Sequence, residues 1–193
     1  MEKLLLVDGR TTAPVMAGVE ARPGTRMIAV ARLWDKCIVA VHVHRCGEDA
    51  ARHLRAVVGQ VVKSVSTVHP RLTITDQKAG TIHYETDEHA IFLLVTDPSY
   101  PQRTAFRCLD ELRLSFRSQF LDQMHKSGEG GLSRDARPLL ADTCVRFADA
   151  AEVDKVLGIQ REVDEVQGVM HDAVSRMLGN RENLEILEDR AGE

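Results

Sequence analysis

Two histidines and a cysteine stand at alternate positions in the first third of the chain, as His42, His44 and Cys46. Alternate residues of a β-strand share one face, and imidazole nitrogen and thiolate sulfur are ligands that zinc prefers. A tetrahedral site needs a fourth ligand, and no neighbouring residue supplies one convincingly. The valines that alternate with the histidines through residues 39–43 are typical of an ordinary half-buried strand. We therefore expect no metal site. A small metal-dependent enzyme that uses these three residues stays an alternative.

The other groups that could act as nucleophiles or bind phosphate lack the partners that such chemistry needs. Cys108 and Cys144 fall on apolar helical stripes, which is typical of small core residues, and no histidine can be placed beside them to activate a thiol. Residues 128–131 form a glycine-rich loop without the lysine and the following Ser or Thr of a phosphate loop. No two carboxylates stand out as an acid and base pair. We expect no catalysis and no cofactor.

The composition narrows the class of protein further. The 193 residues include 25 basic and 29 acidic side chains, with a formal net charge of −4 and no block of Lys and Arg to bind nucleic acid. The longest apolar run, Ala90–Val95, is far shorter than the roughly 20 residues of a membrane helix. Four cysteines without CxxC spacing favour reduced thiols. We expect a soluble, intracellular protein that does not bind nucleic acid.

The elements that position these residues begin with a leader and a hairpin. Residues 1–26 contain glycines and prolines without a sustained period, so we expect a flexible leader with one short strand at Leu4–Val7. Apolar runs at Met27–Leu33 and Cys37–His44 flank a short polar link, which predicts two paired strands.

Helices and three more strands follow. Apolar residues at steps of three and four predict a helix that begins near Glu48 and ends before Pro70. Strand pairs with tight links favour an α+β fold, in which helices cover the faces of a five-stranded, mostly antiparallel sheet. The remaining predicted strands are Leu72–Thr75, Thr81–Thr86 and His89–Val95, and the remaining helices contain Ala105–Met124 and about Pro138–Ala150.

The carboxyl-terminal third has a different pattern. From Val156 onward, alternating steps of three and four visit eleven positions, of which ten are apolar. A period of 3.5 held over five heptads is typical of a coiled-coil seam. The exception, Asn180, stands where a polar residue fixes register and the number of partner helices. The predicted layers are Val156, Ile159, Val163, Val166, Met170, Ala173, Met177, Leu184, Leu187 and Ala191.

An amphipathic helix that packs on its own domain would give a similar pattern. Gly158, Gly168 and Gly179 lower the intrinsic helicity by roughly 1 kcal/mol each relative to alanine. This weakness suits a segment that folds on a partner. We therefore favour the interpretation that the seam binds other helices.

These residues resemble a known family. Val163–Met170, Met177–Leu178, Glu182–Leu187 and Asp189–Ala191 are similar to the helical motif of R-SNAREs, the vesicle-side membrane-fusion proteins. The preceding order of elements resembles the longin domain, a profilin-like fold. Ile82–Tyr84, Phe92–Leu93 and above all Tyr100–Leu112 are most similar to the longin SNARE of traffic between endoplasmic reticulum and Golgi.

Two departures from the family pattern bear on function. R-SNAREs place an arginine at the central polar layer, where this chain has Asn180, followed by Arg181. An asparagine offers two donors and one acceptor in place of five donors, so the layer would stay polar but lose its charge. The family also continues beyond the position of Ala191 to a membrane anchor, which residues 1–193 do not include.

The resemblance implies a division of the chain and a function. We expect a leader at 1–26, a longin domain at 27–126, a loop and linking helix at 127–152, and a SNARE coiled-coil segment at 153–193 that stops before any anchor. The segment would assemble with three Q-SNARE helices in endoplasmic reticulum–Golgi transport, on the cytoplasmic face of these membranes or of transport vesicles. The longin domain would bind a coat protein or the folded-back segment, the latter on Leu54, Val58, Val61 and Val65. The alternative is a soluble longin-type adaptor or non-fusogenic SNARE regulator whose last helix packs on its own domain.

Overall fold

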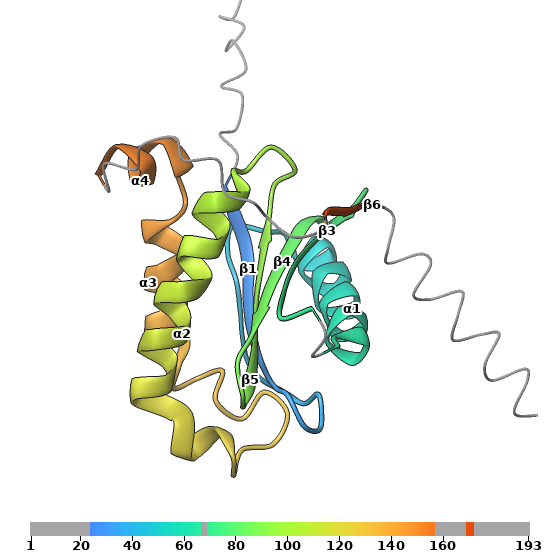
Figure 1. Cartoon of the computed structure of the whole chain (residues 1–193), viewed down its shortest axis with the longest axis vertical. Helices are drawn as coiled ribbons and strands as arrows, with labels where there is room; N and C mark the ends of the chain where they lie inside the picture. Colours follow the sequence, from blue (N-terminus) through green and yellow to red (C-terminus); the bar gives the residue numbers. More distant parts are fainter. Residues whose placement is uncertain (1–23, 67–68, 157–168, 172–193) are drawn as a thin grey trace, which may run out of the picture.

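A twisted sheet with helices on both faces makes up the fold (Figure 1). The computed structural model describes residues 24–66, 69–156 and 169–171. The strands lie in the order β2-β1-β5-β4-β3-β6, and the first five pair antiparallel. Their bounds are Thr25–Arg32 for β1, Ile38–Val43 for β2, Arg71–Asp76 for β3, Gly80–Thr86 for β4, Ala90–Thr96 for β5 and Val169–His171 for β6.

The five-stranded antiparallel sheet expected from the sequence is confirmed, and β6 is an addition to it. β6 pairs parallel with β3, so the sheet gains a sixth strand from the carboxyl-terminal third. The short strand expected at Leu4–Val7 lies outside the described residues.

Helices cover the two faces unequally. Figure 1 shows α1 on one face and α2 with α3 on the other. The helix expected at about 138–150 ends at Arg146. A new helix begins at Ala150, where the carboxylate of Asp149 accepts hydrogen bonds from the N–H groups of Ala151 and Glu152. The bounds are Glu48–Ser64 for α1, Gln102–Met124 for α2, Arg137–Arg146 for α3 and Ala150–Val156 for α4.

Each face of the sheet has its own hydrophobic core. On the α1 side, the helix buries its valines against alternate residues of the strands. On the other side, Leu109 and Phe116 of α2 pack with Leu140 of α3 and Val153 of α4. Residues 127–152, expected as a loop and linking helix, therefore supply part of this second core. The central strand β5 is buried along its whole length because both faces are covered.

The loop after α2 closes one edge of the sheet. The N–H groups of Gly130 and Leu132 donate to the carbonyls of Ile38 and Val39, over 2.8 and 2.9 Å. The N–H of Val41 donates to the hydroxyl of Ser133. The glycine-rich loop thus satisfies backbone groups along β2 that would otherwise lie on an open edge.

Arg32 connects the hairpin turn to the end of α2. Its guanidinium is nearly buried, pairs with Asp35 through two hydrogen bonds, and donates to the carbonyls of Met124 and Ser127. The paired carboxylate raises the pKa of Arg32 above its usual value, and the guanidinium lowers the pKa of Asp35. The pair fixes the turn against the helix.

Candidate functional site

The edge of β3 receives a segment from the carboxyl-terminal third of the chain. Thr73, Ile74 and Thr75 pair in parallel register with Val169, Met170 and His171. Met170, one of the predicted coiled-coil layers, is therefore in a β-strand in this structure. Addition of a strand to a sheet edge is a recurring way of binding a peptide segment, because backbone hydrogen bonds supply the affinity.

A buried polar chain supports this edge from inside the domain. The side-chain amide of Gln102 donates to the hydroxyl of Thr73 over 2.6 Å. The same hydroxyl lies 3.0 Å from one ring nitrogen of His83, and the other ring nitrogen lies 3.2 Å from the hydroxyl of Thr96. Burial lowers the pKa of His83 to about 4, so its imidazole is neutral at neutral pH. These side-chain hydrogen bonds therefore hold β3 in place without using a charged group.

An ion cluster fixes the start of β3 to α2. Arg71 lies 2.9 Å from the carboxylate of Glu85 and 3.3 Å from that of Asp110, and Arg113 lies 3.1 Å from Glu85. Burial raises the pKa of Glu85, and the neighbouring arginines oppose this shift. The Arg71 guanidinium also lies over the ring of Phe106 at 4.8 Å. The start of β3 is thus tied by Arg71 to both β4 and α2.

The fold-back surface expected on α1 is not exposed. Leu54, Val58, Val61 and Val65 are all buried, the most exposed at only 7%. They pack against the sheet as part of the core on that face. A docking segment would not reach these side chains while the domain stays folded, and the segment that does dock lies on the β3 edge instead. This corrects the expected receptor, because an apolar helix stripe marks a core face as readily as a binding face.

Most of the predicted coiled-coil layers fall outside the described residues. Val156 ends α4, and Met170 lies in β6. The central layer residue Asn180 and the layers Ile159, Val163, Val166, Ala173, Met177, Leu184, Leu187 and Ala191 are not described. They stay predictions.

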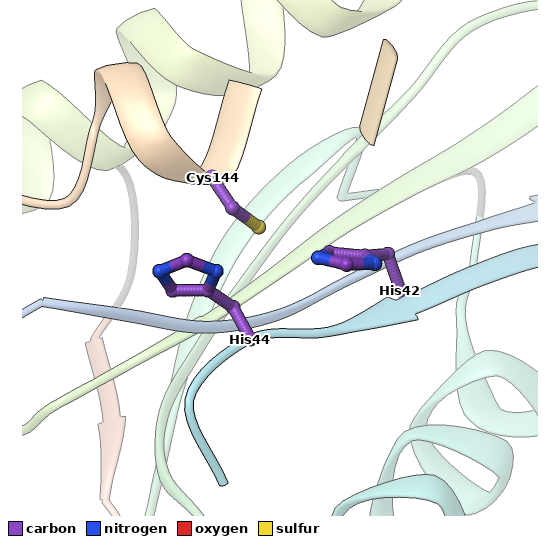
Figure 2. A group of neighbouring side chains, drawn as sticks. All are labelled: His42, His44 and Cys144. Carbon is purple, nitrogen blue, oxygen red and sulfur yellow. The ribbon is translucent and has the colours of Figure 1, made fainter. Parts of the chain in front are cut away.

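A second group of side chains could hold a metal ion. Ligand atoms of His42, His44 and Cys144 all lie within 4.8 Å of one another. Figure 2 shows the Cys144 sulfur of α3 pointing toward two imidazole rings, that of His42 on β2 and that of His44 directly after β2. Cys46, the ligand considered from spacing, is not in the group, and its sulfur contacts the carbonyl of Arg26. The third ligand comes from a residue that local spacing could not find.

Comparison with known proteins identifies the domain. Residues 44–136 match the family model of the longin domain, described as a regulated-SNARE-like domain. Residues 44–136 are thus similar to a longin domain. The longin fold and the resemblance drawn from the sequence are thereby confirmed.

Named relatives extend the match beyond the longin domain. The chain is 31% identical over 97 residues to the VAMP-like protein YKT61 of Arabidopsis thaliana, covering 50% of this chain and 48% of the relative. It is 26% identical over 145 residues to the synaptobrevin homolog YKT6 of Yarrowia lipolytica, covering 71% and 72%. It is 22% identical over 134 residues to vesicle-associated membrane protein 7 of Homo sapiens, covering 69% and 60%. The match with the Arabidopsis protein thus spans about half of that relative's length.

None of the helices in the described part of the chain combines the length and the apolarity that crossing a bilayer requires.

Proposed function

We propose that this chain is an R-SNARE-like protein of vesicle trafficking and membrane fusion, whose residues 153–193 assemble with three Q-SNARE helices under control of the longin domain. Its relatives bear the names of synaptobrevin and vesicle-associated membrane proteins. The single observation that carries the proposal is the pairing of Val169–His171 with the edge of β3. It brings part of the expected SNARE segment onto the domain that would control it.

Strand pairing and coiled-coil assembly exclude each other at Met170. A residue in a strand has an extended backbone, whereas a coiled-coil layer needs a helical one. The docked strand therefore holds part of the seam out of the helical bundle. This gives the longin domain a closed state, in which β6 occupies the edge, and an open state, in which the segment is free to assemble.

The magnitudes favour assembly once partner helices are present. Three paired residues contribute a few hydrogen bonds, each of roughly 1 kcal/mol net. A five-heptad seam buries enough apolar area for tens of kcal/mol at about 25 cal/mol per Å², before ordering entropy is subtracted. The docked strand thus delays assembly without preventing it.

The resemblance also suggests the compartment and the other partners of the protein. We assign the chain to transport between endoplasmic reticulum and Golgi, on the cytoplasmic face of these membranes or of their vesicles. A coat protein would bind the longin domain, and a membrane anchor would follow the segment. Asn180 would give a polar, uncharged central layer opposite the Q-SNARE amides.

Assembly is tested by circular dichroism on the full chain mixed with three Q-SNARE helices. We expect a large gain in helicity and a cooperative melt of the mixture. Val166→Asp and Leu184→Asp place a charge in the seam and should abolish the gain while the longin domain stays folded. The matched control Gln167→Asp changes a neighbouring residue outside the seam and should preserve it. No gain with the unmodified chain would refute the proposal.

A second candidate is a soluble longin-type adaptor or non-fusogenic regulator whose last helix packs permanently on its own domain. The observation that favours it is α4, which buries Ala150 and Val153 in the core shared with α2. On this interpretation, deletion of 153–193 would unfold or aggregate the remainder. A folded remainder that no longer binds Q-SNARE helices would instead support the fusion role.

A further inference from the structure

The face of β2 opposite α1 brings together three side chains that can ligate a metal. His42 and His44 alternate on that face, and Cys144 comes from α3, which packs over it (Figure 2). The alternate valines Val41 and Val43 contact the α1-side core instead. His42 and His44 are therefore polar side chains at half-buried positions of the strand, on the face that α3 covers.

The group contains a polar atom without a partner. Nε2 of His44 is buried and makes no hydrogen bond. A buried ring nitrogen left unpaired costs about 1–3 kcal/mol. This cost indicates that the surroundings of His44 favour a polar ligand or an ion.

We propose that His42, His44 and Cys144 form a binding site for Zn²⁺. Two imidazoles and one thiolate are a donor set suited to zinc. Ligand atoms around tetrahedral zinc lie about 3.3–3.8 Å apart, given Zn–N and Zn–S bonds of about 2.0 and 2.3 Å. The three atoms already lie within 4.8 Å of one another. Side-chain movements of about 1 Å would bring them to the separations that zinc requires.

Zinc binding requires deprotonated ligands. Histidine binds zinc through a neutral imidazole, and cysteine binds it as the thiolate. Burial raises the pKa of the Cys144 thiol to about 12. Zinc binding therefore forms one Zn–S bond, breaks the S–H bond and releases one proton to solvent.

A pocket reaches one ligand of the proposed site. It has a volume of about 580 Å³ and is lined by Thr25, His44, Cys46, Ala148 and Asp149 among others. His44 thus belongs both to the ligand group and to the pocket wall. A fourth coordination position would be taken by water or a small exogenous ligand.

Occupancy would fasten α3 to the sheet. Thr25 already donates a hydrogen bond to the carbonyl of Cys144 over 3.0 Å, which aligns the end of α3 with β1. A metal between Cys144 and the histidines would add a second link, to β2. Zinc would therefore raise the melting temperature of the domain as its concentration rises above the dissociation constant.

The test is metal titration of the full chain after treatment with a chelator and a phosphine reductant. We expect binding of ZnCl2 in calorimetry, and with CoCl2 a thiolate-to-cobalt charge-transfer band in the near ultraviolet. Cys144→Ser should remove the band and weaken zinc binding by more than about 100-fold, since changes even outside the ligand shell cost about 10- to 100-fold. His44→Gln should weaken zinc binding to a similar extent.

Two matched controls separate this site from other thiols. Cys46→Ser removes the cysteine that follows the histidines in sequence, and Cys108→Ser removes a thiol buried in the same core as Cys144. Both variants should keep the cobalt band and the zinc affinity.

Three results would overturn the proposal. One is the absence of a cobalt–thiolate band in the unmodified chain. Another is loss of the band in Cys46→Ser while Cys144→Ser retains it. The third is unchanged zinc affinity in His44→Gln. This variant decides the matter if circular dichroism shows that Cys144→Ser does not fold, because the His44 side chain is only partly buried.

Discussion

Gln102, the first residue of α2, donates its side-chain amide to the hydroxyl of Thr73, whose backbone pairs with Val169 across the sheet edge. The helix start and the docked strand therefore contact the same residue from two sides. Because Thr73 also contacts the buried imidazole of His83, the edge that accepts β6 is continuous with the interior of the domain.

Breaking β6 should expose the β3 edge. Met170→Pro removes a backbone N–H and disfavours a regular strand. We expect amide hydrogen exchange of the β3 groups facing β6 to quicken at least about tenfold, because they lose their partners. Exchange in β5 should not change. Gly192→Pro, near the end of the chain, is the control, and equal exchange in both variants would argue against the docked strand.

The stability of the domain should fall at acidic pH because of His83. Its pKa in the folded domain is about 4, against an ordinary value of 6.5, so the unfolded chain takes up a proton first as the pH falls. The contribution is fully present above pH 6.5 and is lost as the pH falls toward 4, by about 3 kcal/mol in total. Urea unfolding at several pH values measures this. His83→Gln should show a shallower dependence, and an unchanged slope would contradict the assignment.

Arg32 should be far more sensitive to substitution than an exposed arginine. Arg32→Lys cannot reproduce the two bonds to Asp35 together with those to the carbonyls of Met124 and Ser127. We expect a loss of about 2–3 kcal/mol in the free energy of unfolding. Arg52→Lys, whose pair with Asp49 is exposed, should change it by less than about 0.5 kcal/mol. Chemical denaturation compares the two variants directly.

Two glycines should respond to alanine in opposite directions. Gly80 has φ +98°, and an added Cβ would lie 2.3 Å from the carbonyl oxygen of Thr96. Gly80→Ala should therefore destabilise the domain by at least about 2 kcal/mol. Gly59 lies inside α1 with open space around it, so Gly59→Ala should stabilise by about 0.5–1 kcal/mol. Thermal melts of both variants test the pair, and equal shifts would show that backbone conformation is not the cause.

The central layer can be tested by restoring a charge. Asn180→Arg would supply five donors to three glutamine side chains in place of two donors. If the segment assembles in the proposed register, the melting temperature of the mixture with three Q-SNARE helices should rise. Asn183→Arg, three residues further and outside the predicted layers, should leave it unchanged. A rise for Asn183→Arg alone would indicate a different register.

The sequence could predict elements whose signal is local. The valine spacing of α1 and the alternation in β1 and β2 depend on the periods of helix and strand, so the expected bounds lie close to those observed. The expected end of α3 near Ala150 lies beyond the observed end at Arg146, because apolar residues continue past Arg146 while the Asp149 carboxylate caps a new helix.

Contacts between distant residues were beyond the reach of spacing. β6 could not be foreseen because a three-residue stretch around Met170 fits a helical seam and a strand equally well, and pairing with Thr73–Thr75 decides between them. The ligand Cys144 was missed for the same reason, since it lies about a hundred positions from His44 and only the packing of α3 on β2 brings them together. The apolar side chains of α1 are likewise buried because they pack against the sheet, a contact that their spacing alone could not show.

The two edges of the sheet are closed in different ways, and this affects how the protein behaves at high concentration. The β2 edge is covered by the loop that contains Gly130 and Leu132, which belongs to the folded domain. Among the described residues, β6 is the strand that covers the β3 edge at Thr73–Thr75. Release of β6 would leave unpaired backbone groups that a second molecule can pair with. Self-association through this edge should therefore report on the open form, increasing with every change that frees the carboxyl-terminal segment.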